Sequence, residues 1–356
     1  MAQQSLPLDD KPSYRELKRL VTEAGLLDRQ PRYYFVKITS VLLLIGVAIA
    51  LVPLIGDSWW QMATAVFFAI VGIQTATIAH DGGHRQIFKS LRRNDLVALL
   101  ITSPYLGFNY SWWMDQHNKH HGMPNHEDDD PNINLNIWAF TRKQRLQKSG
   151  FSLWMAKYQA ILMIPLQALG AFYKVVESAR FVKNQTLRNP RMELLIFPVY
   201  FAWFLPLIFL SMSTGQAVAF FVVYFLTLGL ALGALIAPNH KGMTMVGDGH
   251  SLDFLHWQVM TARNVRGNFL IDWFYGGLNY QIEHHLFPTM PRNNLSDAIA
   301  IVKPYCERHN IPYHDAGFYE SFSEILSSMH EASAPLREQA DESLLPDADA
   351  GASPAS

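Results

Sequence analysis

The chain has 356 residues, of which 49% are hydrophobic, and its 29 Lys and Arg nearly balance its 30 Asp and Glu. The single cysteine, Cys306, excludes an intrachain disulfide and a cysteine-ligated iron–sulfur cluster. The apolar residues are concentrated in long runs instead of being spread periodically, which indicates a membrane protein. We expect no nucleic acid among its partners.

The two ends of the chain are polar. Residues 1–30 are predicted to form a cytoplasmic N-terminal segment without a cleavable signal, because several Lys and Arg precede the first apolar run at residue 36. Residues 331–356 are rich in Pro, Ser and Ala, and they and the first ten residues are predicted to be disordered. Residues 31–330 are predicted to form one membrane domain.

Four apolar runs in this domain are each long enough to cross about 30 Å of hydrocarbon as a helix. They occupy about residues 36–55, 59–79, 194–211 and 217–237. Short links at residues 56–58 and 212–216 join them into two helical hairpins. Two shorter or interrupted stretches, residues 96–108 and 153–173, are predicted to be interfacial or buried helices, with a fifth span at the second as the alternative.

The positions of Lys and Arg predict the orientation of the hairpins. Seven lie in residues 1–37, fifteen in residues 85–191 and seven in residues 241–337, and neither hairpin link contains one. Because positive charge is retained on the cytoplasmic side, everything except the two links is predicted to be cytoplasmic, including both termini. We therefore expect an all-α, multi-pass protein of a bacterial inner membrane, with four transmembrane helices in two hairpins capped by a cytoplasmic helical domain.

Seven histidines form three clusters at the ends of these apolar segments. The clusters read His80-x-x-x-His84, His117-x-x-His120-His121 and Gln281-x-x-His284-His285. Imidazoles three or four residues apart lie on the same side of a helix, so each cluster can present several nitrogens to a metal centre. His240 follows the last span and adds an eighth, and all eight lie on the cytoplasmic side in the predicted topology.

Eight histidines are too many for one ion, because a tetrahedral zinc site is complete with four ligands. Neutral imidazole suits iron, copper or zinc, and two ions are the economical assignment. The Glu-x-x-His pairs of carboxylate-bridged di-iron bundles are absent from the three clusters. We therefore predict an all-nitrogen di-iron site, with Gln281 as a ligand or a spacer.

Acidic side chains near the clusters are candidate hydrogen-bond acceptors for the distal ring nitrogens, and each could equally be a solvated surface acid. They are Asp81, Asp115, Asp272 and Glu283. The histidines outside the clusters are predicted not to bind metal: His126, His250, His256, His309, His314 and His330. In particular, the segment from His126 to Asp130 is predicted to be a solvated loop.

The three clusters, in this order and at this spacing, resemble the histidine boxes of the membrane-bound fatty acid desaturases. Further matching motifs are Trp112-Trp113-Met114-Asp115-Gln116-His117-Asn118, Pro124-Asn125, Asp130-Pro131, Pro238-Asn239-His240, Gly276-Gly277-Leu278-Asn279-Tyr280-Gln281 and Leu286-Phe287-Pro288. The resemblance covers about residues 30–315. Gln281 stands where other desaturases have a histidine, and in this respect the chain is similar to front-end and some bacterial acyl desaturases. The His-Pro-Gly-Gly motif of the cytochrome domain fused to many front-end enzymes is not in this sequence.

This resemblance implies two non-haem irons, which use oxygen and two electrons to remove two hydrogens from the fatty acyl chain of an acyl lipid or acyl-CoA. It implies eight ligands, namely His80, His84, His117, His120, His121, His240, His284 and His285. The sequence contains neither a dinucleotide-binding fingerprint nor a haem motif. We therefore expect the electrons to come from a separate ferredoxin or cytochrome with its reductase, at a protein surrounded by membrane lipid.

Three other functions remain open at this point. A hydroxylase acting on an acyl chain or sphingolipid would share every ligand and differ in its product. A zinc-dependent lipid hydrolase is disfavoured because the sequence has no His-Glu-x-x-His helix. A membrane receptor or transporter is disfavoured because the ionisable residues cluster beyond the ends of the spans.

Two groups of residues near the clusters have alternative roles. Trp112, Trp113 and Trp273 are candidates for the wall of a substrate tunnel, although tryptophans beside spans are more often membrane-interface anchors. A basic stretch is typical of positive-inside anchoring but could also bind an acidic electron carrier or a phosphorylated headgroup. It consists of Arg85, Lys89, Arg92 and Arg93.

Overall fold

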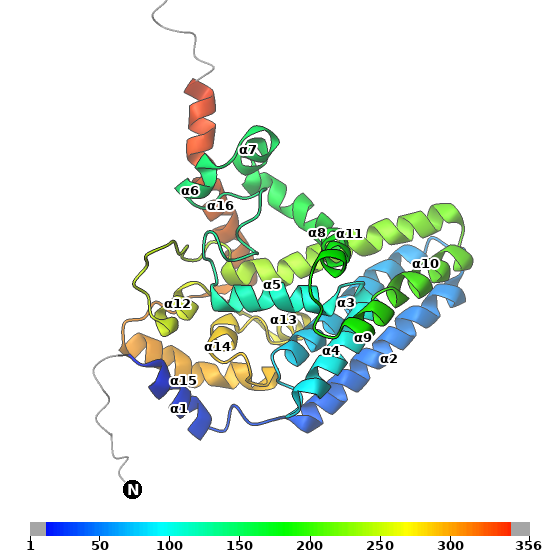
Figure 1. Cartoon of the computed structure of the whole chain (residues 1–356), viewed down its shortest axis with the longest axis horizontal. Coiled ribbons are helices and arrows are strands. Elements are labelled where there is room, and N and C mark those ends of the chain that lie inside the picture. The colour runs from blue at the N-terminus through cyan, green and yellow to red at the C-terminus, as the bar shows by residue number, and fades with distance from the viewer. Residues whose placement is uncertain (1–11, 343–356) are drawn as a thin grey trace, which may run out of the picture.

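The computed structural model describes residues 12–342 and is almost entirely helical (Figure 1). In chain order, its helices are α1 (Tyr14–Glu23), α2 (Pro31–Ile55), α3 (Gln61–Gly83), α4 (Leu91–Leu106), α5 (Tyr110–Gly122), α6 (Arg142–Leu146), α7 (Gly150–Lys157), α8 (Gln159–Asn184), α9 (Pro190–Ile196), α10 (Val199–Ser211), α11 (Thr214–His240), α12 (Phe254–Met260), α13 (Phe269–Tyr275), α14 (Gln281–Leu286), the 3-10 turn η1 (Arg292–Asn294), α15 (Leu295–Arg308) and α16 (Phe318–Glu342). Two short parallel strands, β1 (Asn264–Arg266) and β2 (Asp315–Gly317), pair with each other.

The two predicted hairpins are present as α2–α3 and α10–α11. Their links lie beside each other, because the carboxylate of Asp57 accepts a hydrogen bond from the backbone N–H of Ser213 at 2.8 Å. The chain can turn at the first link because Gly56 has a positive φ of 62°, a conformation that costs glycine little. The two links therefore lie at the same end of the long helices.

Five segments of the described chain are long and apolar enough to cross a membrane, one more than the sequence predicted. The additional one is α8, which extends the expected stretch at residues 153–173 to Asn184. Its polar Gln167 does not interrupt the helix, because this side chain packs against Gly233 of α11. At Gly229 the backbone of α8 comes so close that a β-carbon would lie 2.2 Å from the carbonyl oxygen of Ala168. Small residues on α11 thus allow a close contact between the two helices.

The long helices pack around an aromatic core. Phe68 of α3 stacks on Tyr105 of α4 at 5.3 Å and lies within 6.0 Å of the rings of Phe204 and Tyr224. α4, which is too short to span, packs along α3, as expected for a buried helix. This core packs against the middle of α3, whose last turn carries His80.

A second apolar core lies at the opposite end from the hairpin links, where α1, α12, α14 and α15 gather (Figure 1). The amphipathic α1 inserts Leu17 and Val21 into it, so part of the predicted N-terminal segment is a packed helix. The C-terminal segment also differs from the prediction, because α16 is helical from Phe318 to Glu342 and residues 331–342 are therefore not irregular. The remaining residues predicted to be disordered, 1–10 and 343–356, lie outside the described part of the chain.

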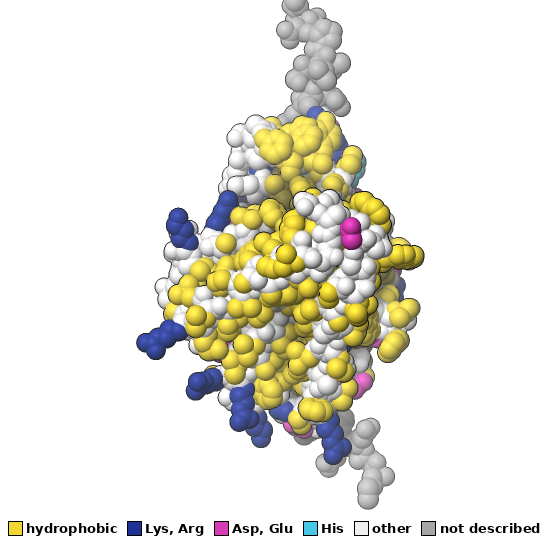
Figure 2. Space-filling model, turned by 90° about the vertical axis from the view of Figure 1, so that its right-hand side faces the viewer, with side chains coloured by type: hydrophobic (Ala, Val, Ile, Leu, Met, Phe, Trp, Pro, Cys, Tyr) yellow, Lys and Arg dark blue, Asp and Glu magenta, His cyan; other side chains and the backbone are white. Residues whose placement is uncertain are grey.

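The surface of the long helices is strongly apolar. Figure 2 shows a face covered mostly by hydrophobic side chains, with Lys and Arg projecting along one margin. Trp59 and Trp60, at the first hairpin link, are 66% and 76% exposed. Exposed tryptophans at the end of apolar helices are typical of membrane-interface anchors. Together with the long apolar helices, this surface identifies an integral membrane protein.

Candidate metal centre

The eight histidines come from four helices that meet at the end of the long helices opposite the links. His80 lies on the last turn of α3, His84 caps this helix, and His240 ends α11. The others lie on the short helices α5 and α14. Asn109 caps the N-terminus of α5, because its side-chain oxygen accepts a hydrogen bond from the backbone N–H of Trp112.

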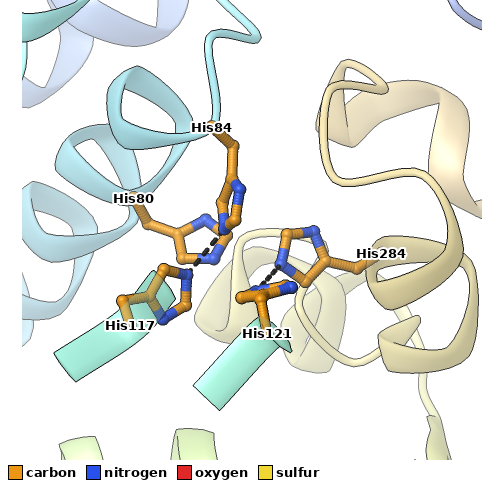
Figure 3. Close-up of side chains that lie close together, drawn as sticks. All are labelled: His80, His84, His117, His121 and His284. Carbon is orange, nitrogen blue, oxygen red and sulfur yellow. Dashed lines mark hydrogen bonds between the residues drawn. The ribbon is translucent and has the colours of Figure 1, made fainter. Parts of the chain in front are cut away.

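The structure divides the eight histidines into two groups (Figure 3 shows the larger). The five-histidine cluster contains His80, His84, His117, His121 and His284, and the three-histidine cluster contains His120, His240 and His285. Within each cluster, one candidate ligand atom from every residue lies within 4.8 Å of the others. The stacked rings of His121 and His285, 4.2 Å apart, connect the two clusters.

Neighbouring histidines in the sequence supply different clusters. His120 and His121 are adjacent on α5 and point to different groups, and so do His284 and His285 on α14. Adjacent residues of an α-helix point about 100° apart, so they cannot easily bind the same ion. Each of the two double-histidine motifs therefore serves both clusters.

In the five-histidine cluster, ring nitrogens face one another directly (Figure 3). The Nε2 atoms of His84 and His117 are 2.6 Å apart, and those of His121 and His284 are 3.2 Å apart. Loss of solvation, together with repulsion among the imidazoles, lowers the pKa of each of these four rings well below its ordinary value. The rings are therefore neutral near pH 7, the form that binds metal.

In the three-histidine cluster, every ring has a hydrogen-bond acceptor outside the cluster. The Nδ1 atom of His120 lies 2.9 Å from a carboxylate oxygen of Asp130, that of His240 2.9 Å from the carbonyl oxygen of Thr261, and that of His285 2.8 Å from Oε1 of Gln258. Each acceptor requires the proton on Nδ1, which leaves Nε2 with a lone pair. The Nε2 atoms of His120 and His240 are 3.2 Å apart, and Nε2 of His285 is buried without a hydrogen-bond partner. Converging, unprotonated nitrogens are what a metal ion requires, so the residues present fit one.

Asp130 is a buried carboxylate, which corrects the prediction of a solvated loop from His126 to Asp130. Besides His120, it accepts backbone hydrogen bonds from Asn125 and Asn132, both at 2.8 Å, and is 0% exposed. Burial raises the pKa of its carboxyl group, but His120 and then the two backbone N–H groups lower it, and the net pKa is below the ordinary value. A carboxylate ten residues after a histidine carries no helical periodicity, so spacing alone did not identify it.

His126 is also buried, at 4% exposure, but belongs to neither cluster. Its Nδ1 atom lies 3.1 Å from a carboxylate oxygen of Asp129. The other histidines predicted not to bind metal, His250, His256, His309, His314 and His330, are likewise outside both groups.

Gln281 lies beside the three-histidine cluster. Its Nε2 atom is 3.0 Å from Nε2 of His240, and its Oε1 atom accepts a hydrogen bond from Asn239 at 3.0 Å. This buried amide thus occupies a position next to the candidate ligand nitrogens.

Asp81 is the one predicted acidic partner that lies near a histidine ring, with an oxygen 3.6 Å from Nδ1 of His80. It forms a buried ion pair with Arg292, whose guanidinium also donates to Thr77 at 3.0 Å. Gly276 makes room for this guanidinium, because a β-carbon there would lie 2.5 Å from the Nη1 atom of Arg292. Arg292 is a residue that sequence reasoning did not single out.

The other three predicted acidic partners bond to groups other than the histidines. Asp115 pairs with Lys119 at 2.8 Å on the surface, and Asp272 accepts hydrogen bonds from Asn279 and Tyr280. Glu283 is fully buried and accepts from Asn264 and Tyr313, both at 2.7 Å. Buried acceptors of this kind hold the segments around the site in place.

A cavity of about 60 Å³ lies beside Trp113, which contacts the five-histidine cluster. Trp112 and Trp113 line it, whereas Trp273 does not. Trp113 stacks on His117 at 4.6 Å and lies 6.0 Å from His80, so its ring separates the cavity from the cluster. It can approach this closely because residue 83 is glycine, where a β-carbon would lie 2.4 Å from the indole.

A mostly helical chain with long apolar helices and two buried histidine clusters at one end of them defines a membrane protein whose histidine clusters are able to bind metal. The family model described as "Fatty acid desaturase" matches residues 57–317. The chain therefore belongs to the fatty acid desaturase family and is an oxidoreductase that desaturates fatty acids.

Several curated relatives support this assignment. The chain is 27% identical to an acyl-lipid (9-3)-desaturase of Physcomitrium patens over 92% of its own length and 63% of the relative's. It is 29% identical to a Delta(6)-fatty-acid desaturase of Caenorhabditis elegans, with 89% and 74% of the two chains covered. It is 30% identical to a Delta(8)-fatty-acid desaturase of Euglena gracilis, with 84% and 74% covered. The chain thus spans less than two thirds of the moss enzyme.

Proposed function

We propose that the two clusters each hold one iron ion and that this di-iron centre desaturates a long-chain acyl group. The observation that carries the proposal is the convergence of eight histidine side chains into two adjoining buried groups. The all-nitrogen donor set suits iron, and the neutral rings need no deprotonation before they bind it. One ion would be held by His120, His240 and His285, and the other by the five-histidine cluster.

The overall reaction converts two adjacent methylene groups, one O2, two electrons and two protons into a carbon–carbon double bond and two waters. Bound iron would supply the oxygen chemistry that removes the two hydrogens. The chain's own residues position the substrate and exclude water, and the apolar cavity beside Trp113 supports this role. We propose that an acyl chain enters the cavity from the bilayer and passes the five-histidine cluster.

We further propose that the double bond forms near the carboxyl end of the acyl chain. Two of the relatives bear Delta(6) and Delta(8) in their names, and these numbers count carbons from the carboxyl group. At such positions the polar end of the substrate can lie only a few bonds from the metals. The acyl carrier, lipid or coenzyme A, would extend from the cavity toward the aqueous side.

Electrons would come from a separate ferredoxin or cytochrome with its reductase, a proposal supported by the lack of a dinucleotide-binding fingerprint and of a haem motif in the given sequence. The basic stretch that follows His84 is the proposed docking surface for the electron carrier. Its members differ in how exposed they are. Lys89, Arg92 and Arg93 are exposed, whereas Arg85 is partly buried and pairs with Asp95. We therefore assign docking to the three exposed side chains.

We propose that four helices cross the membrane and that α8 does not. α3 and α11 both end at the histidine clusters, so the chain between these two ends must cross an even number of times. α10 and α11 already account for two crossings. A crossing by α8 would make the number odd, so α8 is best placed along the membrane, with the site and both termini on the cytoplasmic side.

Cysteine labelling tests this topology. Burial raises the pKa of Cys306 to about 12, so the native thiol should remain unreactive. A cysteine placed at Ser213 should react with an impermeant reagent outside intact cells, whereas cysteines at Ser149 and Gln185, on either side of α8, should both be protected. Labelling of only one of the latter two would show that α8 crosses.

Expression with a reductase and ferredoxin, followed by mass spectrometry of the host's acyl chains, tests the proposed reaction. We expect a new double bond that requires oxygen, both carrier proteins and an intact His240. A hydroxylated acyl chain in place of the alkene would contradict the proposal.

A further inference from the structure

The cavity beside the five-histidine cluster is apolar except for two side chains. Its lining consists of Ala76, Ala79, Thr102, Leu106, Phe108, Trp112, Trp113, Lys174, Leu232 and Ile236. Ala79 immediately precedes His80, and Ile236 lies one helical turn before His240, so the cavity lies beside the ends of α3 and α11 that carry these histidines. The two polar members, Lys174 and Thr102, come from different helices, α8 and α4.

Lys174 is a cation in an apolar setting. Its Nζ atom lies 5.7 Å from the ring centroid of Trp112. Lys174 is half-buried, and burial lowers the pKa of its ammonium group. Within residues 12–342, no carboxylate forms an ion pair with it, and the nearby Lys241 is a further cation. A cation–π contact offsets only part of the cost of removing an ammonium group from water. A cation without an ion-pair partner at the wall of an apolar cavity is a candidate contact for a polar group of the substrate.

Thr102 presents an unpaired hydroxyl to the same cavity. The residue is 5% exposed, and its Oγ1 atom is buried without a hydrogen-bond partner. A threonine within a helix commonly satisfies this hydroxyl with the carbonyl oxygen one turn before it, as Thr75 does with Val71. A buried hydroxyl left without a partner destabilises the folded protein, unless a ligand supplies the partner.

We propose that Lys174 and Thr102 bind the acyl carbonyl group of the substrate and thereby determine which carbons face the metals. A carbonyl oxygen accepts hydrogen bonds from both an ammonium and a hydroxyl group, and it is present in a free carboxylate, an ester and a thioester. From this oxygen, the acyl chain would pass Trp113 toward His80 and His117. The inference rests on the proposed function and adds the residues that set the position of the double bond.

Three variants and one control test this assignment. Lys174→Met removes the charge while keeping a side chain of similar length, Lys174→Arg keeps the charge, and Thr102→Val removes the hydroxyl with little change of shape. Lys183→Met is the matched control, because Lys183 is an exposed cation on the same helix. Each full-length protein is expressed with its electron carriers, its iron content is measured, and the positions of the new double bonds are determined by mass spectrometry.

Equilibrium binding gives a second measurement that does not depend on turnover. Purified protein is titrated with palmitic acid and, separately, with its methyl ester. We expect Lys174→Met and Thr102→Val to bind palmitic acid roughly tenfold more weakly than the wild type. A loss of similar size for the ester would identify the neutral carbonyl as sufficient, whereas a loss for the acid alone would identify the carboxylate as the ligand.

The expected result is a double bond spread over neighbouring positions in Lys174→Met and Thr102→Val, and a single position in Lys174→Arg and Lys183→Met. Iron content like that of the wild type shows that a variant has folded. If Lys174→Met does not fold, the binding and product of Thr102→Val test the inference. The inference is overturned if both iron-loaded variants bind palmitic acid and place the double bond as the wild type does. A wild type that forms no double bond would instead contradict the proposed function.

Discussion

The two histidine clusters are stabilised in different ways. In the three-histidine cluster, acceptors outside the cluster bond to all three rings and leave each Nε2 unprotonated, so the ligand atoms are ready before metal binds. The five-histidine cluster has more rings, but they mainly face one another, and Asp81 is its nearest carboxylate at 3.6 Å. The geometry of the three-histidine cluster therefore depends on the acceptors around it, whereas metal binding at the five-histidine cluster depends on the number of its rings.

The largest expected effect separates the clusters by ligand number. His240→Ala leaves only two histidines in the smaller cluster, so iron should fall from two toward one per chain and turnover should be abolished. His117→Ala leaves four rings in the larger cluster and should retain more iron. Metal analysis and oxygen-dependent product formation check both variants.

His126→Ala is the matched control, because this buried histidine belongs to neither cluster and should keep its iron. Full activity in His240→Ala would remove this residue from the set of ligands and contradict the assignment.

Asp130→Asn tests whether the smaller cluster depends on its hydrogen-bond acceptors. The amide cannot hold the proton on Nδ1 of His120 as firmly as the carboxylate does, so we expect roughly 10- to 100-fold weaker iron binding. Competition with a chelator measures the affinity. Asp115→Asn, at a surface acid that pairs with Lys119, should change little. Equal affinities for both variants would show that Asp130 has no such role.

Arg292→Met probes the support of the larger cluster. It leaves the buried carboxylate of Asp81 without its ion-pair partner, which typically costs about 3–5 kcal/mol of folding free energy. We expect a lower Tm in detergent and partial recovery when Asp81→Leu is added, because an apolar pair then replaces the ions. Arg266→Met, at an exposed ion-pair site, should have little effect. An unchanged Tm in Arg292→Met would contradict a structural role for the pair.

The smallest expected effect lies outside both clusters. Arg92→Ser with Arg93→Ser should reduce turnover several-fold at a limiting concentration of electron carrier and leave iron content unchanged, since these side chains are exposed. The difference in turnover between the double variant and the wild type should diminish as salt is added, because salt screens the attraction between the basic side chains of the wild type and the carrier. A defect that persists at saturating carrier would argue against docking.

The sequence predicted much of this arrangement. Long apolar runs identified both hairpins, histidine spacing identified seven of the eight histidines, and the position of His240 after the last span identified the eighth. It did not reveal how the clusters divide adjacent histidines such as His120 and His121, because this depends on where helices from distant parts of the chain meet. The length of α8 was underestimated because the apolar run ends before Lys174, whereas the helix continues through charged residues to Asn184.

Sequence analysis missed the residues whose role depends on contacts with distant parts of the chain. Asp130 lies in an acidic run that resembles a solvated loop, and only the fold shows that backbone donors bury it beside His120. Arg292 lies 211 residues from Asp81 and gives no local signal. Glu283 shows the opposite case. It was predicted to accept a hydrogen bond from a histidine ring because it is next to His284 in the sequence, but its carboxylate accepts hydrogen bonds from Asn264 and Tyr313 instead.

Metal analysis of the purified, full-length protein tests the central claim most directly. If each cluster binds one ion, the wild type should contain close to two irons per chain and little zinc. One iron per chain at full activity, or zinc in place of iron, would contradict a di-iron centre built from two histidine clusters.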